Sequence, residues 1–280
     1  MLPSLRRAAF RAYGTLLPRH AARWFEGVLL TPRPVPALDI AAPHVPHAVR
    51  RLPYGTGWLT MTEWGSGPAV LLVHGWGGRS ESLHAFVEPL AAAGYRAVTI
   101  DLPAHGTSDG RRTNLIDSAG AVLQAGRAAG PLAGIITHSF GGAVTALACH
   151  HGLRAGRIVM LAPPQSIRSL SLPIGDWLGL PRAVSEEMMD TFVRRLGVTW
   201  EELRTDRLVA EFDTPLLVVH DEDDRVVPWS HGAAVARSAP GAALHTTSGL
   251  GHRDVLLDPS VLAQAVAWVG RAAEGARMVA

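Results

Sequence analysis

The chain contains no lysine, and all 26 of its basic residues are arginine. We attribute this bias to a GC-rich bacterial genome rather than to function. Cysteine is nearly absent as well: Cys149 is alone, so no internal disulfide can form. The formal net charge is only +2, which gives no support for binding to nucleic acid.

Long apolar runs are also missing. No stretch of about 18 apolar residues is present, so we expect no membrane-spanning helix. The first 25 residues lack the apolar stretch that follows the charges of a secretory signal, and we expect a cytoplasmic protein. No glycine-rich nucleotide motif and no convincing metal-ligand spacing occurs, so we expect neither cofactor nor metal.

Residues 1–47 are predicted to form an amphipathic helix followed by an extended, proline-rich segment. Pro18 ends the helical pattern, and five residues share one apolar face: Leu5, Ala9, Ala12, Tyr13 and Leu16. Five arginines precede the first acid, so a helix lying on an anionic membrane surface is one interpretation. We favour a helix packed on the domain, because packing requires only an apolar face.

The remaining 230 or so residues alternate between buried strands and helices, which predicts a mainly parallel sheet flanked by helices. A hairpin around Gly55–Gly57 precedes this pattern. The expected strands span 69–75, 96–103, 132–138, 157–164, 215–221 and 243–249; the expected helices span 80–94, 113–130, 140–151, 229–239 and 259–274.

Chemically capable side chains follow these strands at the points where the strands end. His74, Ser139, an acidic run at 221–224 and His252 all take such positions. Ligands of parallel α/β sheets bind at the carboxyl ends of the strands, so we expect these residues to lie together. A serine hydroxyl becomes a good nucleophile when a base takes its proton and a carboxylate orients that base. The chain order Ser, Asp, His fits this chemistry.

At this point the sequence resembles the α/β-hydrolase superfamily, over roughly residues 50 to 275. The resemblance rests on five motifs in order: "LLVHGWGG", "DLPAHGTSDG", "THSFGGAV", "VVHDEDDRVVP" and "GLGH". It is most similar to esterase and lipase-like members with a serine nucleophile. Members that open epoxides or remove halogens use an aspartate at the position of Ser139, so the resemblance argues against those activities.

The resemblance implies a role for each site residue. It makes Ser139 the nucleophile, His252 the base and Asp224 the acid, with Asp221 in a position where the family has glycine. Asp221 and Asp223 remain alternatives for the acid. The backbone N–H groups of Trp76 and Phe140 are expected to form the oxyanion hole.

Thr137 departs from the G-x-S-x-G pattern, because it stands where the first glycine belongs. The turn around Ser139 needs small residues on both sides. We therefore expect Thr137 to be accommodated by a small residue on the neighbouring strand. Its hydroxyl is a candidate partner for the loop that carries the acid or the histidine.

About 50 residues separate the strand at 157–164 from the strand at 215–221, which is far more than an ordinary connection. We interpret 165–213 as a helical cap over Ser139, inserted between core segments 48–164 and 214–280. Ligand pockets are mostly apolar. The candidate pocket residues are His74, Trp177, Met188, Met189 and Phe192.

The sequence thus predicts a cap-bearing α/β-hydrolase fold and cleavage of carboxylic esters through an acyl-enzyme. We expect a small, uncharged or acyl-chain-containing ester as substrate, because no cluster of charges marks a polar recognition site. Acyl transfer or thioester cleavage with the same triad is the alternative among enzymes. A ligand-binding protein on a catalytically inactive scaffold is the alternative outside them.

Overall fold

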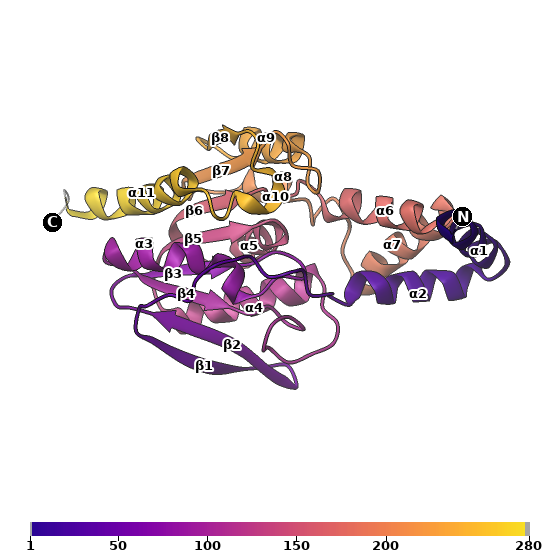
Figure 1. The fold of residues 1–280 in the computed structure, drawn as a ribbon, viewed down its shortest axis with the longest axis horizontal. Coiled ribbons are helices and arrows are strands. Elements are labelled where there is room, and N and C mark those ends of the chain that lie inside the picture. Colours follow the sequence, from indigo (N-terminus) through magenta and orange to yellow (C-terminus); the bar gives the residue numbers. More distant parts are fainter. Residues whose placement is uncertain (1, 278–280) are drawn as a thin grey trace.

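The computed structural model describes the backbone of residues 2–277 and the side chains of residues 4–271. Met1 and residues 278–280, which belong to the first and last predicted segments, lie outside the described residues. A sheet domain carries a lobe of helices that projects from one end of the sheet (Figure 1). Within residues 2–277 no helix combines the length and hydropathy needed to cross a bilayer.

One eight-stranded sheet forms the centre of the domain, in the order β1-β2-β4-β3-β5-β6-β7-β8. The β1–β2 and β2–β4 pairs are antiparallel, and all other pairs are parallel. The predicted hairpin and parallel sheet are confirmed. The strands are β1 (His47–Tyr54), β2 (Gly57–Trp64), β3 (Ala69–Val73), β4 (Arg96–Ile100), β5 (Leu132–His138), β6 (Ala155–Leu161), β7 (Leu216–Asp221) and β8 (Ala243–Thr247).

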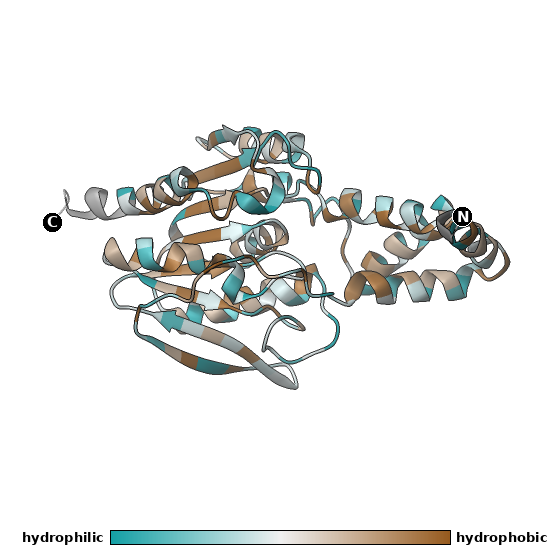
Figure 2. Cartoon of the chain, viewed as in Figure 1, coloured by the Kyte–Doolittle hydropathy of each residue, from teal (hydrophilic) through white to brown (hydrophobic). Residues whose placement is uncertain are grey.

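Helices cover both faces of the sheet, which explains why the central strands are mostly apolar and why β3 and β7 are buried along their whole length (Figure 2). One face packs against α4 (Leu115–Ala129), α5 (Phe140–His150), α8 (Thr205–Val209) and α9 (Trp229–Ser238). The other packs against the 3₁₀ turn η1 (Ser80–Phe86), α3 (Val87–Ala92) and α11 (Pro259–Arg277). The short helix α10 (Gly251–Asp254) connects β8 to α11.

The projecting lobe consists of α1 (Leu2–Leu16), α2 (Pro18–Leu30), α6 (Ile167–Leu178) and α7 (Arg182–Leu196). We call these four helices the helical lobe. They pack around a small core of their own: Ala21, Phe25, Leu172, Leu180, Met188 and Met189. The N-terminal helices α1 and α2 thus form one unit with α6 and α7 of the insertion at 165–213. Helix α8, at the end of that insertion, packs instead on α5 and α9 of the sheet domain.

The N-terminal helix packs by a different face from the predicted one. Leu5, Ala9, Ala12 and Leu16 are exposed, and of the expected face only Tyr13 is partly buried. The side that contacts the lobe carries Phe10, whose ring meets Trp24, and Gly14, which lies against Pro181. Pro18 ends α1 as predicted and also begins α2, because proline is well accommodated at the first helical position.

Candidate active site

Ser139 lies at a sharp turn between β5 and α5. Its φ of 52° and ψ of −122° are unusual for a residue with a side chain, and such strain costs on the order of 1–3 kcal/mol. The turn is held because the N–H of Ser139 donates to the carbonyl of Leu161 at 2.8 Å. Gly141 allows the close approach of helix and strand: a Cβ there would lie 2.5 Å from the carbonyl oxygen of Val73.

Thr137 is fully buried two residues before Ser139. Its register partners on the adjacent strands are Val73 and Met160, so the expected small residue on the neighbouring strand is absent. The space comes instead from Gly142 of α5, where a Cβ would lie 3.5 Å from the Thr137 hydroxyl. That hydroxyl donates to the carbonyl of Val159 at 3.3 Å rather than to the acid or histidine loop.

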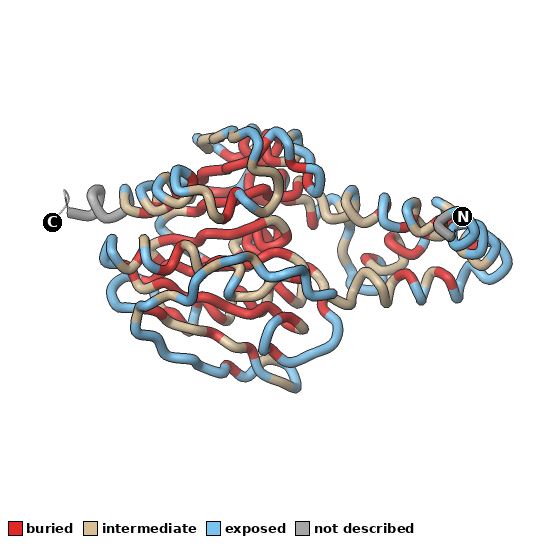
Figure 3. The backbone as a smooth tube through the Cα atoms, in the orientation of Figure 1, coloured by how far each residue is buried: buried red, intermediate tan, exposed pale blue. Residues whose placement is uncertain are grey.

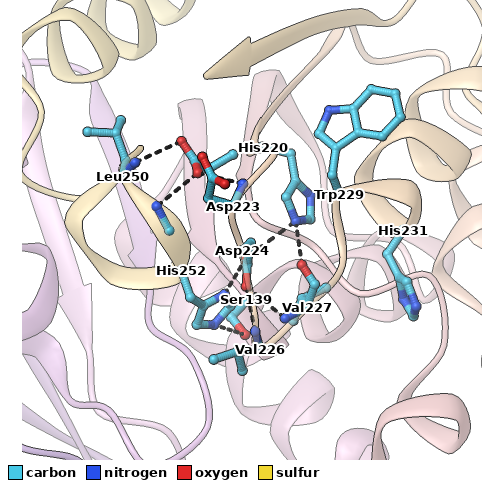
Figure 4. Close-up of polar contacts among 12 residues, drawn as sticks. Ser139, His220, Asp223, Asp224, Val226, Val227, Trp229, His231, Leu250 and His252 are labelled. Carbon is cyan, nitrogen blue, oxygen red and sulfur yellow. Dashed lines mark hydrogen bonds and ion pairs between the residues drawn. The ribbon is translucent and has the colours of Figure 1, made fainter. Parts of the chain in front are cut away.

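Ser139, His252 and Asp224 form a continuous chain of hydrogen bonds (Figure 4). The Oγ of Ser139 lies 3.0 Å from Nε2 of His252. The Nδ1 of the same ring lies 2.7 Å from Oδ2 of Asp224. Since a carboxylate accepts, Nδ1 carries the proton and Nε2 is left free to accept the hydroxyl proton of Ser139.

Asp224 is buried and its carboxylate is fully engaged. Oδ1 accepts the N–H groups of Val226 and Val227, both at 2.8 Å. Burial by itself raises the pKa of this carboxyl, but hydrogen bonds from His220, His252 and the backbone outweigh burial and hold the pKa well below its ordinary value. Asp224 is therefore ionised and fixed in orientation.

His220 is a member of the site that sequence reasoning missed. Its ring is fully buried, with Nε2 2.8 Å from the carbonyl of Val227 and 3.4 Å from Oδ2 of Asp224 (Figure 4). Its Nδ1 has no partner among the described residues, so the proton sits on Nε2 and is directed at these oxygens. The sequence signal that could have identified it is its position between the apolar strand residues and the acidic run that begins at Asp221.

The two alternative acids have other partners. The carboxylate of Asp221 accepts the backbone N–H groups of Leu250 and Gly251 and the hydroxyl of Thr247. The carboxylate of Asp223 accepts from Ser248 and Gly249. Both thus hold the loop that leads to His252, and neither bonds the imidazole.

His138, directly before Ser139, contacts His252 and holds its backbone in place. Its Nε2 donates to the carbonyl of His252 at 2.8 Å, and the two rings lie 4.7 Å apart between centroids. Burial, together with the neighbouring His252, lowers the pKa of His138 to about 3. The ring is therefore neutral and acts as a positioning residue.

The loop after β3, which carries Gly75 and Trp76, passes close to Ser139. Gly75 permits this approach, since a Cβ there would lie 3.1 Å from the Cβ of Ser139. The loop is anchored because Gly77 donates its N–H to Nε2 of His105 at 3.0 Å. Within the described residues, no acceptor is assigned to the N–H of Trp76 or of Phe140, and their rings meet edge to face at 5.1 Å.

His74 does not line a pocket, contrary to the sequence-based expectation. It is fully buried, its Nδ1 donates to the carbonyl of Gly75 at 2.8 Å, and its Nε2 accepts the N–H of Leu102 at 3.1 Å. Burial, with a further contribution from His105, lowers its pKa to about 4. A neutral imidazole satisfied on both nitrogens ties two strand ends together and has no group left for a ligand.

A cavity of about 500 Å³ lies over Ser139, between the domain and the helical lobe. Ser139, His252, Trp76 and Phe140 line its floor. The predicted residues Met188, Met189 and Phe192 of α7 line it as well. Helix α2 and the extended segment after it also contribute, which no sequence pattern indicated; these residues are Leu29, Leu30, Val35 and Leu38.

Trp177 is the second pocket residue that the structure places elsewhere. Its side chain is 64% exposed at the end of α6 and does not line the cavity. The guanidinium of Arg6 lies over its ring, 5.0 Å from the centroid. Among the described residues, no group of three or more His, Cys, Asp or Glu side chains has a metal-binding arrangement.

The chain is similar in sequence to known proteins. A model described as the alpha/beta hydrolase family matches residues 70–265. A 2-hydroxy-6-oxononadienedioate/2-hydroxy-6-oxononatrienedioate hydrolase of Cupriavidus pinatubonensis is 29% identical over 240 residues, covering 67% of this chain and 78% of that protein. The dihydrolipoyllysine-residue acetyltransferase component of the acetoin cleaving system of Cupriavidus necator is 28% identical over 226 residues. That match covers 67% of this chain but only 59% of the acetyltransferase component.

Solved structures share the fold at low sequence identity. An esterase of a Rhodococcus species superposes with a TM-score of 0.59 at 22% identity, covering 79% of this chain and 98% of the esterase. A thioesterase domain from the curacin biosynthetic pathway gives a TM-score of 0.59 at 16% identity, covering 79% of this chain and 99% of the domain. With the sheet order, the turn at Ser139 and the family match over residues 70–265 in agreement, the chain belongs to the alpha/beta hydrolase family.

Proposed function

We propose that the protein is a serine hydrolase that cleaves carboxylic esters through an acyl-enzyme intermediate. The observation that carries this proposal is the unbroken chain from Ser139 through His252 to Asp224, which opens onto an apolar cavity. Each of the three side chains has the partner and the proton position that nucleophilic catalysis requires.

In the acylation step, Oγ of Ser139 attacks the ester carbonyl while Nε2 of His252 takes the hydroxyl proton. The resulting imidazolium is stabilised by the carboxylate of Asp224. The N–H groups of Trp76 and Phe140 bind the developing oxyanion, and each such donor contributes about 3 kcal/mol in comparable sites. His252 then protonates the leaving alkoxide, and a water molecule activated by the same imidazole hydrolyses the acyl-enzyme.

The lining of the cavity supports an uncharged acyl chain as the group that is bound. Two of its members are a glutamate and an arginine: Glu26 pairs with Arg195 at 2.5 Å, and Arg253 donates one N–H to the carbonyl of Pro36 at 2.5 Å. The hydrolase of Cupriavidus pinatubonensis is named for a dioate, which carries two carboxylates. Among the described residues of the lining, Arg253 is the single arginine, which is too few for two carboxylates, so we favour a monoester of an aliphatic acid.

Hydrolysis of p-nitrophenyl esters with acyl chains of two to sixteen carbons, by wild type and by Ser139→Ala, tests the proposal. We expect turnover by wild type, with the highest kcat/KM for a medium or long chain, and a loss of about five to six orders of magnitude in the variant. Turnover that survives Ser139→Ala would contradict the mechanism, and absence of turnover by wild type with tight binding of the esters would favour a non-catalytic binding protein.

Acyl transfer and thioester cleavage use the same acyl-enzyme. Adding a range of alcohols to the assay measures partition to a new ester, and acyl-coenzyme A analogues measure thioester cleavage. We expect hydrolysis of oxygen esters to dominate both side reactions. A partition that strongly favours an alcohol acceptor over water would assign acyl transfer instead.

A further inference from the structure

The outward face of α1 carries an unpartnered apolar stripe. Leu5, Ala9, Ala12 and Leu16 recur at helical spacing and are all exposed, with Leu5 at 73% and Leu16 at 77%. Figure 3 shows that α1 is exposed along most of its length. The opposite side of the helix, with Phe10 and Gly14, is the one that packs on the lobe. The helix is therefore apolar on two sides, and only one of them is used by the described fold.

The exposed apolar surface continues beyond α1. Leu17, at the junction with α2, is 51% exposed. Trp177 of α6 is 64% exposed and lies under the guanidinium of Arg6. Tryptophan and arginine side chains with an apolar body and a polar end are typical of the boundary between water and lipid. The helical lobe thus exposes leucine side chains on α1 and an arginine–tryptophan pair between α1 and α6.

Charge along the first 25 residues has a single sign. The first acid in the chain is Glu26, after five exposed arginines: Arg6, Arg7, Arg11, Arg19 and Arg23. The nearest acids are engaged, since Glu26 pairs with Arg195, and Asp176 pairs with Arg182. Arg6, Arg7 and Arg11 lie on α1 itself, which carries no acid, and helical spacing puts Arg6 about a quarter turn from the apolar stripe. An exposed apolar stripe on an arginine-bearing helix without acids matches a surface with negative headgroups above an apolar interior.

We propose that the outward face of α1 docks the protein on the surface of an anionic lipid bilayer, with the helix lying parallel to the membrane. A second copy of this chain fits the surface less well, because an isologous contact brings the arginines of both copies together. Docking also places the helical lobe, whose helices α2, α6 and α7 line the cavity over Ser139, against the lipid. The binding surface is independent of the chemistry at Ser139.

Cosedimentation of the full chain with vesicles tests the proposal. The probes are vesicles of phosphatidylcholine alone and vesicles with about one quarter phosphatidylglycerol, at about 0.1 M and about 0.5 M NaCl. We expect binding to the anionic vesicles at least about tenfold tighter than to the neutral ones, and weaker binding at high salt. Ser139→Ala must bind as wild type does, so failure of ester hydrolysis and failure of docking are separate outcomes.

Point variants locate the surface. Leu5→Glu and Leu16→Glu replace exposed side chains, and each should weaken vesicle binding about tenfold or more while leaving the thermal midpoint unchanged. Val49→Glu, at a 61% exposed position on β1, is the matched control and should bind as wild type does. Equal binding of all three variants and wild type would overturn the proposal. So would sedimentation equilibrium that shows a dimer lost in Leu16→Glu, because the stripe would then be covered by a second copy.

Discussion

The carboxylate of Asp221 accepts the backbone N–H of Gly251, the residue directly before His252, at 2.9 Å. It also accepts from Leu250, Thr247 and the N–H of Asp223, and it is 1% exposed. Burial raises the pKa of this carboxyl, but the donors outweigh burial and keep the pKa below its ordinary value. Asp221 therefore anchors the loop that leads to His252.

We expect Asp221→Asn to destabilise the protein by about 1–3 kcal/mol, because the amide nitrogen of asparagine faces N–H groups that need an acceptor. Turnover should fall through misplacement of His252, by less than in Asp224→Asn. Denaturant unfolding measures the first effect and kcat the second. Asp223→Asn, whose partners Ser248 and Gly249 are exposed, is the control; an Asp221→Asn variant as stable as this control would contradict the anchoring role.

Asp224→Asn should lower kcat by about three to four orders of magnitude, because an amide beside Nδ1 favours the wrong tautomer of His252. The fold should persist, since Asn keeps an oxygen for the N–H groups of Val226 and Val227. Steady-state kinetics with a p-nitrophenyl ester, next to circular dichroism, measures both. A kcat within tenfold of wild type would remove Asp224 from the proposed triad.

On acidification, the protein should begin to lose stability at pH values well above the pKa of its carboxyl groups. His138 and His74 have folded pKa values lowered by burial to about 3 and about 4, against about 6.5 in the unfolded chain. The unfolded state thus binds more protons as the pH falls below about 6.5, and stability drops by up to about 1.4 kcal/mol per pH unit for each histidine. Above about 6.5 the contribution is fully present.

His138→Gln tests this dependence, because glutamine retains an N–H donor for the carbonyl of His252 but cannot titrate. Between about pH 4.5 and about pH 6.5, the free energy of unfolding, measured with denaturant, should change with pH by up to about 1.4 kcal/mol per pH unit less than in wild type, and the two slopes should agree above about pH 6.5. An unchanged slope would mean that His138 is accessible to protons in the folded state.

Leu29 of α2 lines the cavity although it lies outside the part of the chain that matches the family. Leu29→Trp should fill part of the cavity and lower kcat/KM for long acyl esters by about tenfold or more, because the extra volume displaces the chain. The two-carbon ester should react within about twofold of wild type. Arg23→Trp, exposed on the same helix, is the control, and equal chain-length profiles for the two variants would place the acyl chain elsewhere.

Local patterns predicted the sheet well, because each buried parallel strand is apolar on both faces and each flanking helix begins and ends with recognisable residues. The strands around Ser139, Asp224 and His252 were found in this way, and strand ends brought the three residues to one edge. Motif order supplied the roles proposed for them.

The predictions were wrong where contacts between distant parts of the chain determine which side chains are buried and which line the cavity. His74 was assigned to the pocket because it follows a strand end, yet both of its ring nitrogens are hydrogen-bonded, to Gly75 and Leu102. The face of α1 with Leu5 and Leu16 was expected to pack, and a helical wheel cannot tell which of two apolar sides meets a partner. The contribution of α2 to the cavity depends on contacts between helices about 160 residues apart, which no local pattern encodes.

The surroundings of Thr137 could not be predicted from local sequence either. Its space is provided by Gly142 across the turn, not by the neighbouring strand. Thr137→Val keeps the shape and loses only the bond to Val159, so turnover should stay within about threefold of wild type and stability should fall by about 1 kcal/mol. Thr137→Leu overpacks the site and should cost about 1–3 kcal/mol and much of the turnover. A leucine variant with full stability and turnover would show that residue 137 is not confined.

The most direct measurement is the mass of the intact protein after reaction with a p-nitrophenyl alkylphosphonate, which reacts with an activated serine and mimics the tetrahedral intermediate. The proposed mechanism predicts that wild type gains the mass of one phosphonyl group, located by peptide mapping on Ser139, with release of p-nitrophenol. Ser139→Ala and His252→Ala should gain none under the same conditions. A phosphonyl group on any other residue, or an adduct that forms equally in Ser139→Ala, would contradict the assignment of Ser139 as the nucleophile.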